Sequence, residues 1–288
     1  MSKEKILSTK REGDNKKDEI PTPTDKCLLL DLDMTLIDKS YNISDPLIFE
    51  TIKKLQNKGW DVGLNSNTPL EPLFVWMRYF GMNGPVIAEK GAVVYAGGNV
   101  LFNEKQAALI QSSIKGMIGS LIAASIQWLP GNPVDIIREH RYGDLQPGPL
   151  VLVDTSRKCS VSFYVREVIP NGEAIVNPDL TRTMIEKLRG HALLAGNLEE
   201  ELHLEEGRYL ALPKGQTKRL GILTLMKYGG LTQVGVVGDS MNDFLGDDIA
   251  IHYAVGNAKE DYKHKAMFIS EFPMTKGCVD IIERIASK

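Results

Sequence analysis

The chain has 288 residues, 43% of them hydrophobic, and a formal net charge of −3. This length allows one large or two modest domains with a sizeable buried core. The slightly acidic balance gives no reason to expect nucleic acid as a partner, and no apolar run reaches the ~18 residues of a membrane span.

Two features at the level of the whole chain indicate the compartment. The three cysteines show no C-x-x-C spacing, which argues against a disulfide framework or a zinc site. The N-terminus lacks the hydrophobic core of a signal peptide. Residues 1–26 alternate charges with Ser, Thr, Gly and Pro, and we predict a disordered tail there. We therefore expect a cytoplasmic protein with no membrane partner, as a monomer or a homodimer.

The first predicted element carries the strongest chemical signal. A continuous apolar run begins at Cys27 and is typical of a strand buried on both faces of a parallel sheet. It ends in Asp31 and Asp33, separated by Leu32, and the period of two points both carboxylates to the same side. Two like charges at such a distance repel unless a cation lies between them or one carboxylate keeps its proton.

Strand and helix then alternate, with a change of character in the middle third of the chain. The first alternation predicts a helix over 45–58, a strand ending at 64, a helix over 69–80 and a strand over 86–88. The middle third combines helix-like stretches at 104–124 and 178–189 with strand-like ones at 150–153 and 159–165. After it we expect a helix over 215–228, strands over 234–237 and 251–255, and a helix over 277–286.

This order predicts an α/β protein with a Rossmann-like parallel-sheet core and an inserted α/β cap domain. We assign residues 27–95 and 208–288 to the core and residues 96–207 to the cap.

A second strand ends in the same chemistry as the first. The β-branched run at 234–237 is followed by Gly238 and Asp239, and Asn242 and Asp243 come within one turn. If both strands lie side by side in one parallel sheet, Asp31, Asp33, Asp239 and Asp243 converge at one edge. Four carboxylates there need a hard divalent cation, and an oxygen-only ligand set favours Mg²⁺.

These residues resemble the haloacid dehalogenase superfamily of phosphatases and phosphotransferases. Its first motif, hhhhDxDx[TV], corresponds to 28–35, and its second, a strand ending in Thr or Ser, to 62–67 with Ser66 at the key position. The fourth motif, GDxxND, corresponds to 238–243, and the third is a lysine on a helix. Segments at 85–92, 213–218 and 254–258 are similar to the Cof-like branch with a large cap, which includes phosphoglycolate, sucrose-phosphate and mannosyl-3-phosphoglycerate phosphatases.

The resemblance implies a role for each motif residue. Asp31 is the expected nucleophile and Asp33 the expected general acid and base. Ser66, with the following backbone N–H at Asn67, is expected to bind the transferring phosphoryl group. The same resemblance implies Mg²⁺ bound by Asp31, Asp239 and the backbone carbonyl of Asp33, with Asp243 orienting a metal-bound water or its own loop.

The third-motif lysine has two candidates, Lys214 and Lys218, and register against the G-x-[ST]-K-G pattern of the family favours Lys218. Asn242 either touches the phosphate or is an exposed turn residue. Lys90 stands where many relatives carry Asn, and our hypothesis is that it meets an anionic group of the substrate. Four cap residues are further candidates for selecting an anionic leaving group: Arg138, His140, Arg141 and Arg166.

The function that the resemblance implies is a Mg²⁺-dependent phosphatase that hydrolyses a small phosphorylated metabolite through an aspartyl-phosphate. A sugar phosphate or a phosphoglycolate-like or phosphoglycerate-like compound would be the substrate. A phosphomutase or phosphotransferase with the same intermediate is the alternative within this chemistry. A phosphometabolite-binding protein without catalysis is the alternative from another class.

Overall fold

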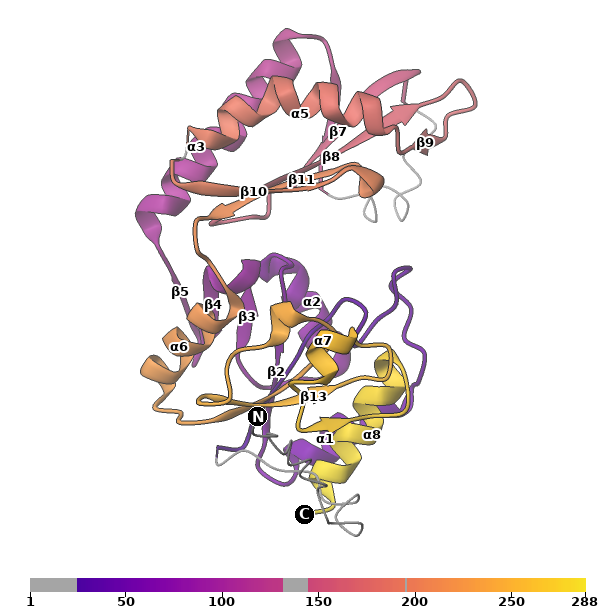
Figure 1. Cartoon of the computed structure of the whole chain (residues 1–288). Helices are drawn as coiled ribbons and strands as arrows, with labels where there is room; N and C mark the ends of the chain where they lie inside the picture. The colour runs from indigo at the N-terminus through magenta and orange to yellow at the C-terminus, as the bar shows by residue number, and fades with distance from the viewer. Residues whose placement is uncertain (1–24, 132–144, 195) are drawn as a thin grey trace, which may run out of the picture.

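The chain forms two β-sheets, one above the other, joined by two crossings of the backbone (Figure 1). A computed structural model describes residues 25–131, 145–194 and 196–288. The predicted tail and three of the cap candidates, Arg138, His140 and Arg141, therefore lie outside the described residues, except for the last two residues of the tail. In the described part of the chain, no helix is both long and apolar enough to cross a membrane.

The lower sheet has eight strands in the order β14-β13-β12-β1-β2-β3-β4-β5. Its first six strands run parallel, which confirms the predicted Rossmann-like core. The strands are β1 (Cys27–Leu30), β2 (Asp61–Asn65), β3 (Val86–Ala88), β4 (Val93–Ala96), β5 (Asn99–Phe102), β12 (Val234–Gly238), β13 (Ala250–Ala254) and β14 (Phe268–Ile269). The central strand β1 is fully buried, as a sheet covered on both faces requires.

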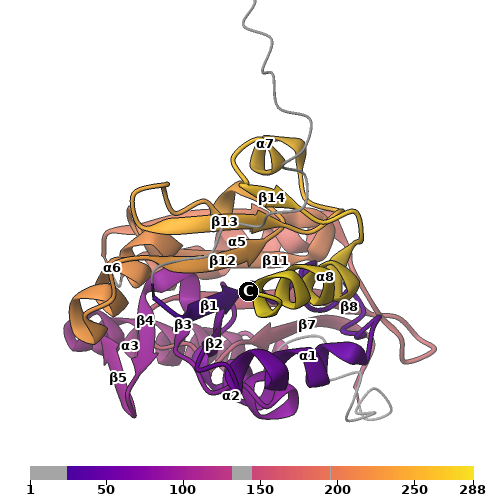
Figure 2. The same cartoon turned by 90° about the horizontal axis from the view of Figure 1, so that it is seen from below.

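Helices cover both faces of this sheet because alternate strand residues point to opposite sides. Leu28 and Leu30 belong to one apolar cluster and Leu29 to another. Figure 2 shows α1, α2 and α8 along one side of the sheet and α6 on the other. The helices of this part are α1 (Leu47–Gln56), α2 (Leu70–Phe80), α6 (Lys218–Gly229), α7 (Glu260–Lys263) and α8 (Met274–Ala286).

The upper sheet forms the cap and has the strand order β10-β11-β8-β7-β6, with β9 paired to β8. Two long helices, α3 and α5, cover the face of this sheet that points away from the core (Figure 1). The elements are β6 (Gln127–Pro130), β7 (Gly148–Val153), β8 (Val161–Val168), β9 (Ala174–Ile175), β10 (Leu198–His203), β11 (Arg208–Pro213), α3 (Glu104–Ala123) and α5 (Pro178–Leu193). The class predicted from sequence, an α/β core with an inserted α/β cap, is confirmed.

The chain passes between the two sheets at other residues than the sequence analysis expected. Strand β5 still belongs to the core sheet, as the second strand of a hairpin with β4. This hairpin turns at Gly97 and Gly98, whose φ angles of 55° and 82° lie in the left-handed region. Strand β11 belongs to the cap sheet. We therefore propose to place the cap between Phe102 and Pro213 rather than over 96–207.

Candidate active site

The ends of β1 and β12 bring the carboxylates of the first and fourth motifs together. The two strands are parallel neighbours, with Leu30 opposite Val237, and the backbone N–H of Asp31 donates to the carbonyl of Val237 at 2.9 Å. Carboxylate oxygens of Asp31, Asp239 and Asp243 all lie within 4.8 Å of one another. The structure therefore brings three of the four predicted carboxylates to one edge of the sheet.

Lys218 lies inside this carboxylate group, whereas Lys214 is exposed. The ammonium of Lys218 is 2.6 Å from Oδ1 of Asp31 and 2.6 Å from Oδ1 of Asp243. Desolvation disfavours a charge at this buried position, but the carboxylates of Asp243 and Asp31 outweigh it and raise the pKa of Lys218. Burial also raises the pKa of Asp31, against the lowering effect of the Lys218 charge.

A close approach of two glycines positions the helix that carries Lys218. A Cβ atom on Gly221, in the first turns of α6, would lie 2.7 Å from the Cα of Gly91. A Cβ atom on Gly91, whose φ is 92°, would lie 2.4 Å from the carbonyl oxygen of Thr217. The backbone of α6 can therefore lie directly against the turn after β3. Lys218, which follows Thr217, reaches the edge of the sheet from there.

Asp243 orders the loop of the fourth motif. Its Oδ2 accepts hydrogen bonds from the backbone N–H groups of Asp239 and Ser240, at 3.1 and 3.3 Å, while its Oδ1 accepts from Lys218. A Cβ atom on Gly238 would lie 2.3 Å from Oδ2 of Asp243, so only glycine leaves room for this carboxylate. The next carboxylate, Asp239, is half-buried, and burial together with the Asp243 charge raises its pKa to about 6.

Asp33 occupies a different place from the other three carboxylates. Its side chain is exposed and is not part of the group of Asp31, Asp239 and Asp243. The expectation that the Asp33 side chain converges with the other three carboxylates therefore finds no support in the described structure, because the backbone turns after Leu32; its backbone carbonyl, the group that the resemblance implies as a metal ligand, stays a prediction. Desolvation raises the pKa of Asp33, and the positive charges of Lys218 and Arg208 lower it.

The loop that contains Asp33 is held from the C-terminal part of the chain. Met34 has a φ of 60°, and its carbonyl accepts a hydrogen bond from the Asn257 side chain at 2.8 Å. Thr275 Oγ1 donates to the carbonyl of Leu36 at 2.7 Å. Thr35 Oγ1 donates to Oδ2 of Asp31 at 3.3 Å. These contacts fix the direction in which both carboxylates of the first motif leave the strand.

The second motif supplies a buried hydroxyl group. Ser66 follows β2 directly, is 1% exposed, and accepts a hydrogen bond at Oγ from the backbone N–H of Thr68 at 3.2 Å. Asn67 is half-buried, and its side-chain Oδ1 is enclosed without a hydrogen-bond partner. Asn242 of the fourth motif is exposed, and no hydrogen bond of its side chain is observed in the described structure.

Lys90 links the core to the cap. It has a φ of 57°, in the left-handed region that asparagine adopts more readily than lysine. Its ammonium forms an ion pair with Glu201 on β10. The predicted contact of Lys90 with an anionic substrate therefore competes with a carboxylate of the cap that is already present.

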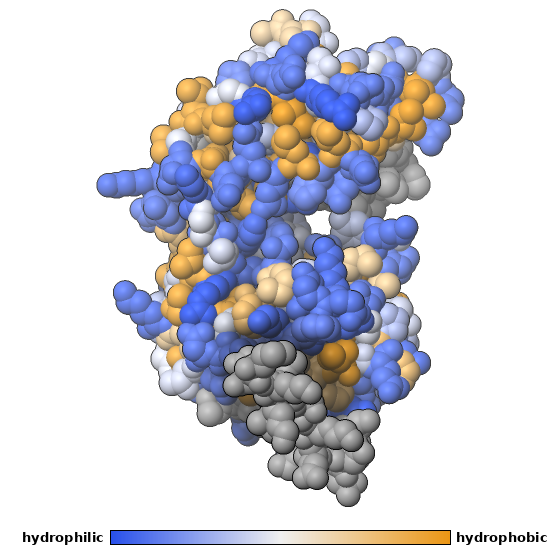
Figure 3. Space-filling model, viewed as in Figure 1, coloured by the Kyte–Doolittle hydropathy of each residue, from blue (hydrophilic) through white to orange (hydrophobic). Residues whose placement is uncertain are grey.

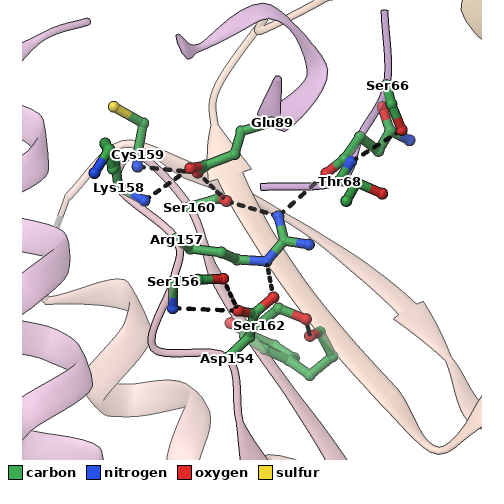
Figure 4. A network of polar contacts seen from close by, with 12 residues as sticks. Ser66, Thr68, Glu89, Asp154, Ser156, Arg157, Lys158, Cys159, Ser160 and Ser162 are labelled. Atoms are coloured by element: carbon green, nitrogen blue, oxygen red, sulfur yellow. Dashed lines mark hydrogen bonds and ion pairs between the residues drawn. The ribbon is translucent and has the colours of Figure 1, made fainter. Parts of the chain in front are cut away.

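A loop of the cap packs against the core beside the second motif. We call residues 154–160, between β7 and β8, the docking loop. Its backbone and side-chain groups donate three hydrogen bonds to the fully buried carboxylate of Glu89 (Figure 4): from Lys158 N at 2.7 Å, Cys159 N at 3.0 Å and Ser160 Oγ at 2.6 Å. The side chain of Cys159 packs within the apolar cluster of the core.

Arg157 completes this docking. Its guanidinium is 2% exposed and donates to Oδ2 of Asp154 at 2.9 Å and to Ser160 Oγ at 3.0 Å. The same group donates to the backbone carbonyl of Asn67 at 3.3 Å, so the cap contacts the residue after Ser66 directly. Burial of charged groups requires such pairing, and here it joins the cap to the second motif.

We expect Glu89→Gln to lower the free energy of unfolding by about 3 kcal/mol. The amide of glutamine turns one acceptor into a donor that faces N–H and O–H donors, so at least one buried group loses its partner. Urea unfolding followed by circular dichroism measures the change. Glu186→Gln on the exposed side of α5 is the matched control and should stay within ~0.5 kcal/mol of the wild type. An equally small change in Glu89→Gln would show that the docking contacts contribute nothing to stability.

The sequence analysis missed Glu89, Arg157 and Arg208. Glu89 and Arg157 are polar residues in stretches with no recognisable spacing, and their partners lie about 70 and 90 positions away in the chain. One signal was available in the sequence. Gly91 follows β3 and has a φ in the left-handed region, so it marks a tight turn in the segment that contains Glu89. Arg208 lies on a strand that the sequence analysis did not predict.

The carboxylate group is suited to a hard cation. Asp31, Asp239 and Asp243 offer oxygen donors only, while the one ammonium among them, Lys218, leaves the group net negative. Hard divalent cations take carboxylate oxygens and water as ligands. The residues present therefore fit the metal ion that the motifs predict.

Comparison with known proteins agrees with this arrangement. A profile of haloacid dehalogenase-like hydrolases matches residues 28–121, which carry Asp31, Asp33 and Ser66. A phosphoglycolate phosphatase of Sulfolobus acidocaldarius is 25% identical over 266 residues, which is 90% of this chain and 96% of that protein. A phosphoglycolate phosphatase of Staphylothermus marinus is 24% identical over 262 residues, again 90% of this chain and 96% of that protein.

Solved structures share the architecture. A haloacid dehalogenase-like hydrolase from Bacteroides thetaiotaomicron has a TM-score of 0.64 at 18% identity and covers 91% of this chain and 99% of its own. The two chains thus share a fold over nine-tenths of this chain. The profile match over residues 28–121 and the relatives aligned over nine-tenths of the chain support the resemblance to haloacid dehalogenase-like hydrolases that the motifs carry.

Proposed function

We propose that the chain is a Mg²⁺-dependent phosphatase that hydrolyses a small phosphorylated metabolite through an aspartyl-phosphate on Asp31. The observation that carries this proposal is the buried carboxylate of Asp31 at a strand end, held by Lys218 at 2.6 Å beside Asp239 and Asp243. The two curated relatives, both phosphoglycolate phosphatases, support the phosphatase class. We further propose a cytoplasmic monomer or homodimer.

Asp31, Asp239 and Asp243 would hold the magnesium ion. Bound there, the ion supplies positive charge that lowers the repulsion between an attacking carboxylate and a phosphate dianion. The remaining positive charge comes from Lys218. Phosphate monoesters react very slowly in water, so neutralising and positioning the phosphoryl oxygens is most of the catalytic task.

In the first step, a carboxylate oxygen of Asp31 attacks phosphorus in line with the ester bond, and that bond breaks. Thr35 and Lys218 hold the Asp31 carboxylate from two sides and so fix its orientation. Ser66 donates its hydroxyl proton to an oxygen of the transferring phosphoryl group. Asp33 gives a proton to the leaving oxygen, which departs as an alcohol.

In the second step, Asp33 takes a proton from water, which attacks phosphorus and releases inorganic phosphate from Asp31. This double role needs a carboxyl group that is protonated at the start and titrates near neutral pH. Desolvation raises the pKa of Asp33 in that direction. Its separation from the carboxylate group and its place facing Arg208 of the cap put it on the side of the leaving group.

The cap limits the size of the substrate. The docking loop and the Lys90–Glu201 ion pair hold the cap against the core on two sides of the site. Figure 3 shows the opening that remains between the two halves of the molecule. We infer that a small metabolite reaches Asp31 through such an opening, whereas a folded nucleic acid or protein substrate does not.

The test is phosphate release from a panel of phosphoglycolate, phosphoglycerates, sugar phosphates and p-nitrophenyl phosphate. We expect turnover of at least one member with Mg²⁺ and a loss of more than ~10²-fold with EDTA, because the carboxylate group repels a phosphate dianion without the metal. Formation of an isomeric sugar phosphate without inorganic phosphate would instead identify a phosphomutase. A folded protein that binds members of the panel and turns none of them over would contradict the enzyme itself.

A further inference from the structure

The open face of the cap sheet points toward the active site. Residue Tyr209 of β11 is fully buried in the cluster formed with α3 and α5, so its neighbour Arg208 lies on the opposite face. Glu201 on β10 is opposite Leu210 and therefore shares the face of Arg208. Because Glu201 reaches Lys90 of the core, this face of the cap is the one that meets the core.

Arg208 lies on the core-facing side of the cap sheet, and its charge is one of those that act on Asp33. The positive charges that lower the pKa of the Asp33 carboxyl group are those of Lys218, from the core, and Arg208, from the cap. Glu206 acts in the opposite sense, but its side chain is exposed and its charge is screened by water. Arg208 thus contributes positive charge from above to the residue that we propose as proton donor to the leaving oxygen.

Among the described residues, no hydrogen bond or ion pair of the Arg208 guanidinium is observed. Its Nε–H is enclosed and has no hydrogen-bond partner, and in the described part of the chain no carboxylate forms an ion pair with it. Its guanidinium lies over the ring of Tyr164, 5.7 Å from the centroid, and that ring also packs against the guanidinium of Arg166 at 5.9 Å. Stacking of this kind fixes the plane of the group and leaves its N–H edge available.

Of the two positively charged side chains Lys90 and Arg208, only one is available to a ligand. Lys90 and Arg208 both lie where core and cap meet, but the charge of Lys90 is compensated by Glu201. A partly desolvated guanidinium without a counter-charge is energetically unfavourable unless an anion pairs with it. A planar carboxylate completes it best, because two parallel N–H···O bonds match its geometry.

We propose that Arg208 binds a second anionic group of the substrate, a carboxylate on the carbon skeleton of the leaving group. This inference rests on the proposed phosphatase function and names its substrate class: small phosphate monoesters of hydroxy acids. The leaving oxygen is next to Asp33, and the atoms attached to that oxygen extend toward the cap, where Arg208 presents its donors. Arg208 is thus a specificity-determining residue and not part of the bond-breaking machinery.

A matched pair of substrates isolates this contact. Phosphoglycolate and 2-hydroxyethyl phosphate share their carbon skeleton and their phosphate, and differ by a carboxylate in place of CH₂OH. We expect the wild type to prefer phosphoglycolate, and Arg208→Gln to lower the ratio of the two kcat/KM values by about 10- to 100-fold. The loss should fall mainly on KM. Arg208→Lys should recover part of the ratio, since it keeps the charge and loses the bidentate geometry.

The control is Arg189→Gln, which removes an arginine of the same cap from a surface pair with Glu200 and should leave the ratio unchanged. The proposal would be overturned if Arg208→Gln had the same ratio of kcat/KM values as the wild type. This holds whether the two kcat/KM values stay unchanged or fall together. If the wild type turned over neither compound, the wider substrate panel would still decide the phosphatase proposal separately. Calorimetric binding of the same two compounds to wild type and Arg208→Gln would then decide the role of Arg208 by the same ratio.

Discussion

Asp31→Asn is expected to lower kcat for phosphate release by at least ~10⁴-fold, because the amide that replaces the carboxylate is too weak a nucleophile to attack phosphorus. The variant should still fold, since Lys218 keeps Asp243 as a partner at 2.6 Å. Steady-state phosphate release measures the loss. Acid quenching with labelled substrate should trap phosphoprotein in the wild type and none in the variant.

A matched control separates the loss of the nucleophile from the loss of one negative charge. Asp179→Asn also exchanges an aspartate for asparagine, but at a side chain of α5 that is 91% exposed and forms an ion pair with Arg182. It should keep full activity and full trapping of label. An Asp31→Asn enzyme that retained a tenth of the wild-type rate would exclude Asp31 as the nucleophile and would refute the aspartyl-phosphate route.

Lys218→Met is expected to combine a large loss of activity with a loss of stability that metal reverses. Removing the ammonium leaves the buried carboxylates of Asp31 and Asp243 without their cation, and breaking a buried pair in this way costs about 3–5 kcal/mol. The phosphoryl group also loses a fixed positive charge, for which we expect a decrease in kcat of about 10³-fold. Urea unfolding with EDTA and with Mg²⁺ should show that the metal restores most of the lost stability.

Lys214→Met is the natural comparison, because Lys214 was the competing candidate for the same motif and is exposed. We expect it to match the wild type in both assays. Loss of activity in Lys214→Met with a normal Lys218→Met enzyme would reverse the assignment. If Lys218→Met does not accumulate as folded protein without metal, Lys218→Arg, which keeps the charge, should fold and remain impaired in kcat.

The part of the site built on neighbouring parallel strands could be predicted from the sequence. Asp31 and Asp239 each follow a buried apolar run, and parallel neighbours necessarily bring their carboxyl ends to one edge. Lys218 was identifiable by its register in a family pattern. The predicted helices agree with the observed ones within a few residues at most ends because their apolar positions repeat with the helical period.

The contacts between core and cap could not be predicted in this way. Strand β10 reads Leu-Glu-Glu-Glu-Leu-His and lacks the apolar alternation by which a strand is recognised, so the face that carries Glu201 was invisible in the sequence. The side chain of Asp33 was expected to converge with the other three carboxylates because strand periodicity was extended past Leu30, where the strand in fact ends. Glu89 and Arg208 have partners or neighbours in the other sheet, and such contacts leave no local pattern.

The docking loop also contains a thiol whose reactivity reports on the separation of cap and core. All three thiols, Cys27, Cys159 and Cys278, are buried and unoxidised, but only Cys159 lies at the boundary between cap and core. Burial, followed by the Glu89 charge, raises the pKa of Cys159 to about 12, so its thiol is inert to alkylation while the loop stays docked. Cys27 and Cys278 sit within the core and become reactive only when the core itself opens. The rate at which Cys159 is alkylated, relative to the rates of these two thiols, therefore measures how often the cap separates from the core. The measurement needs no engineered label, because the reactive thiol belongs to the native sequence.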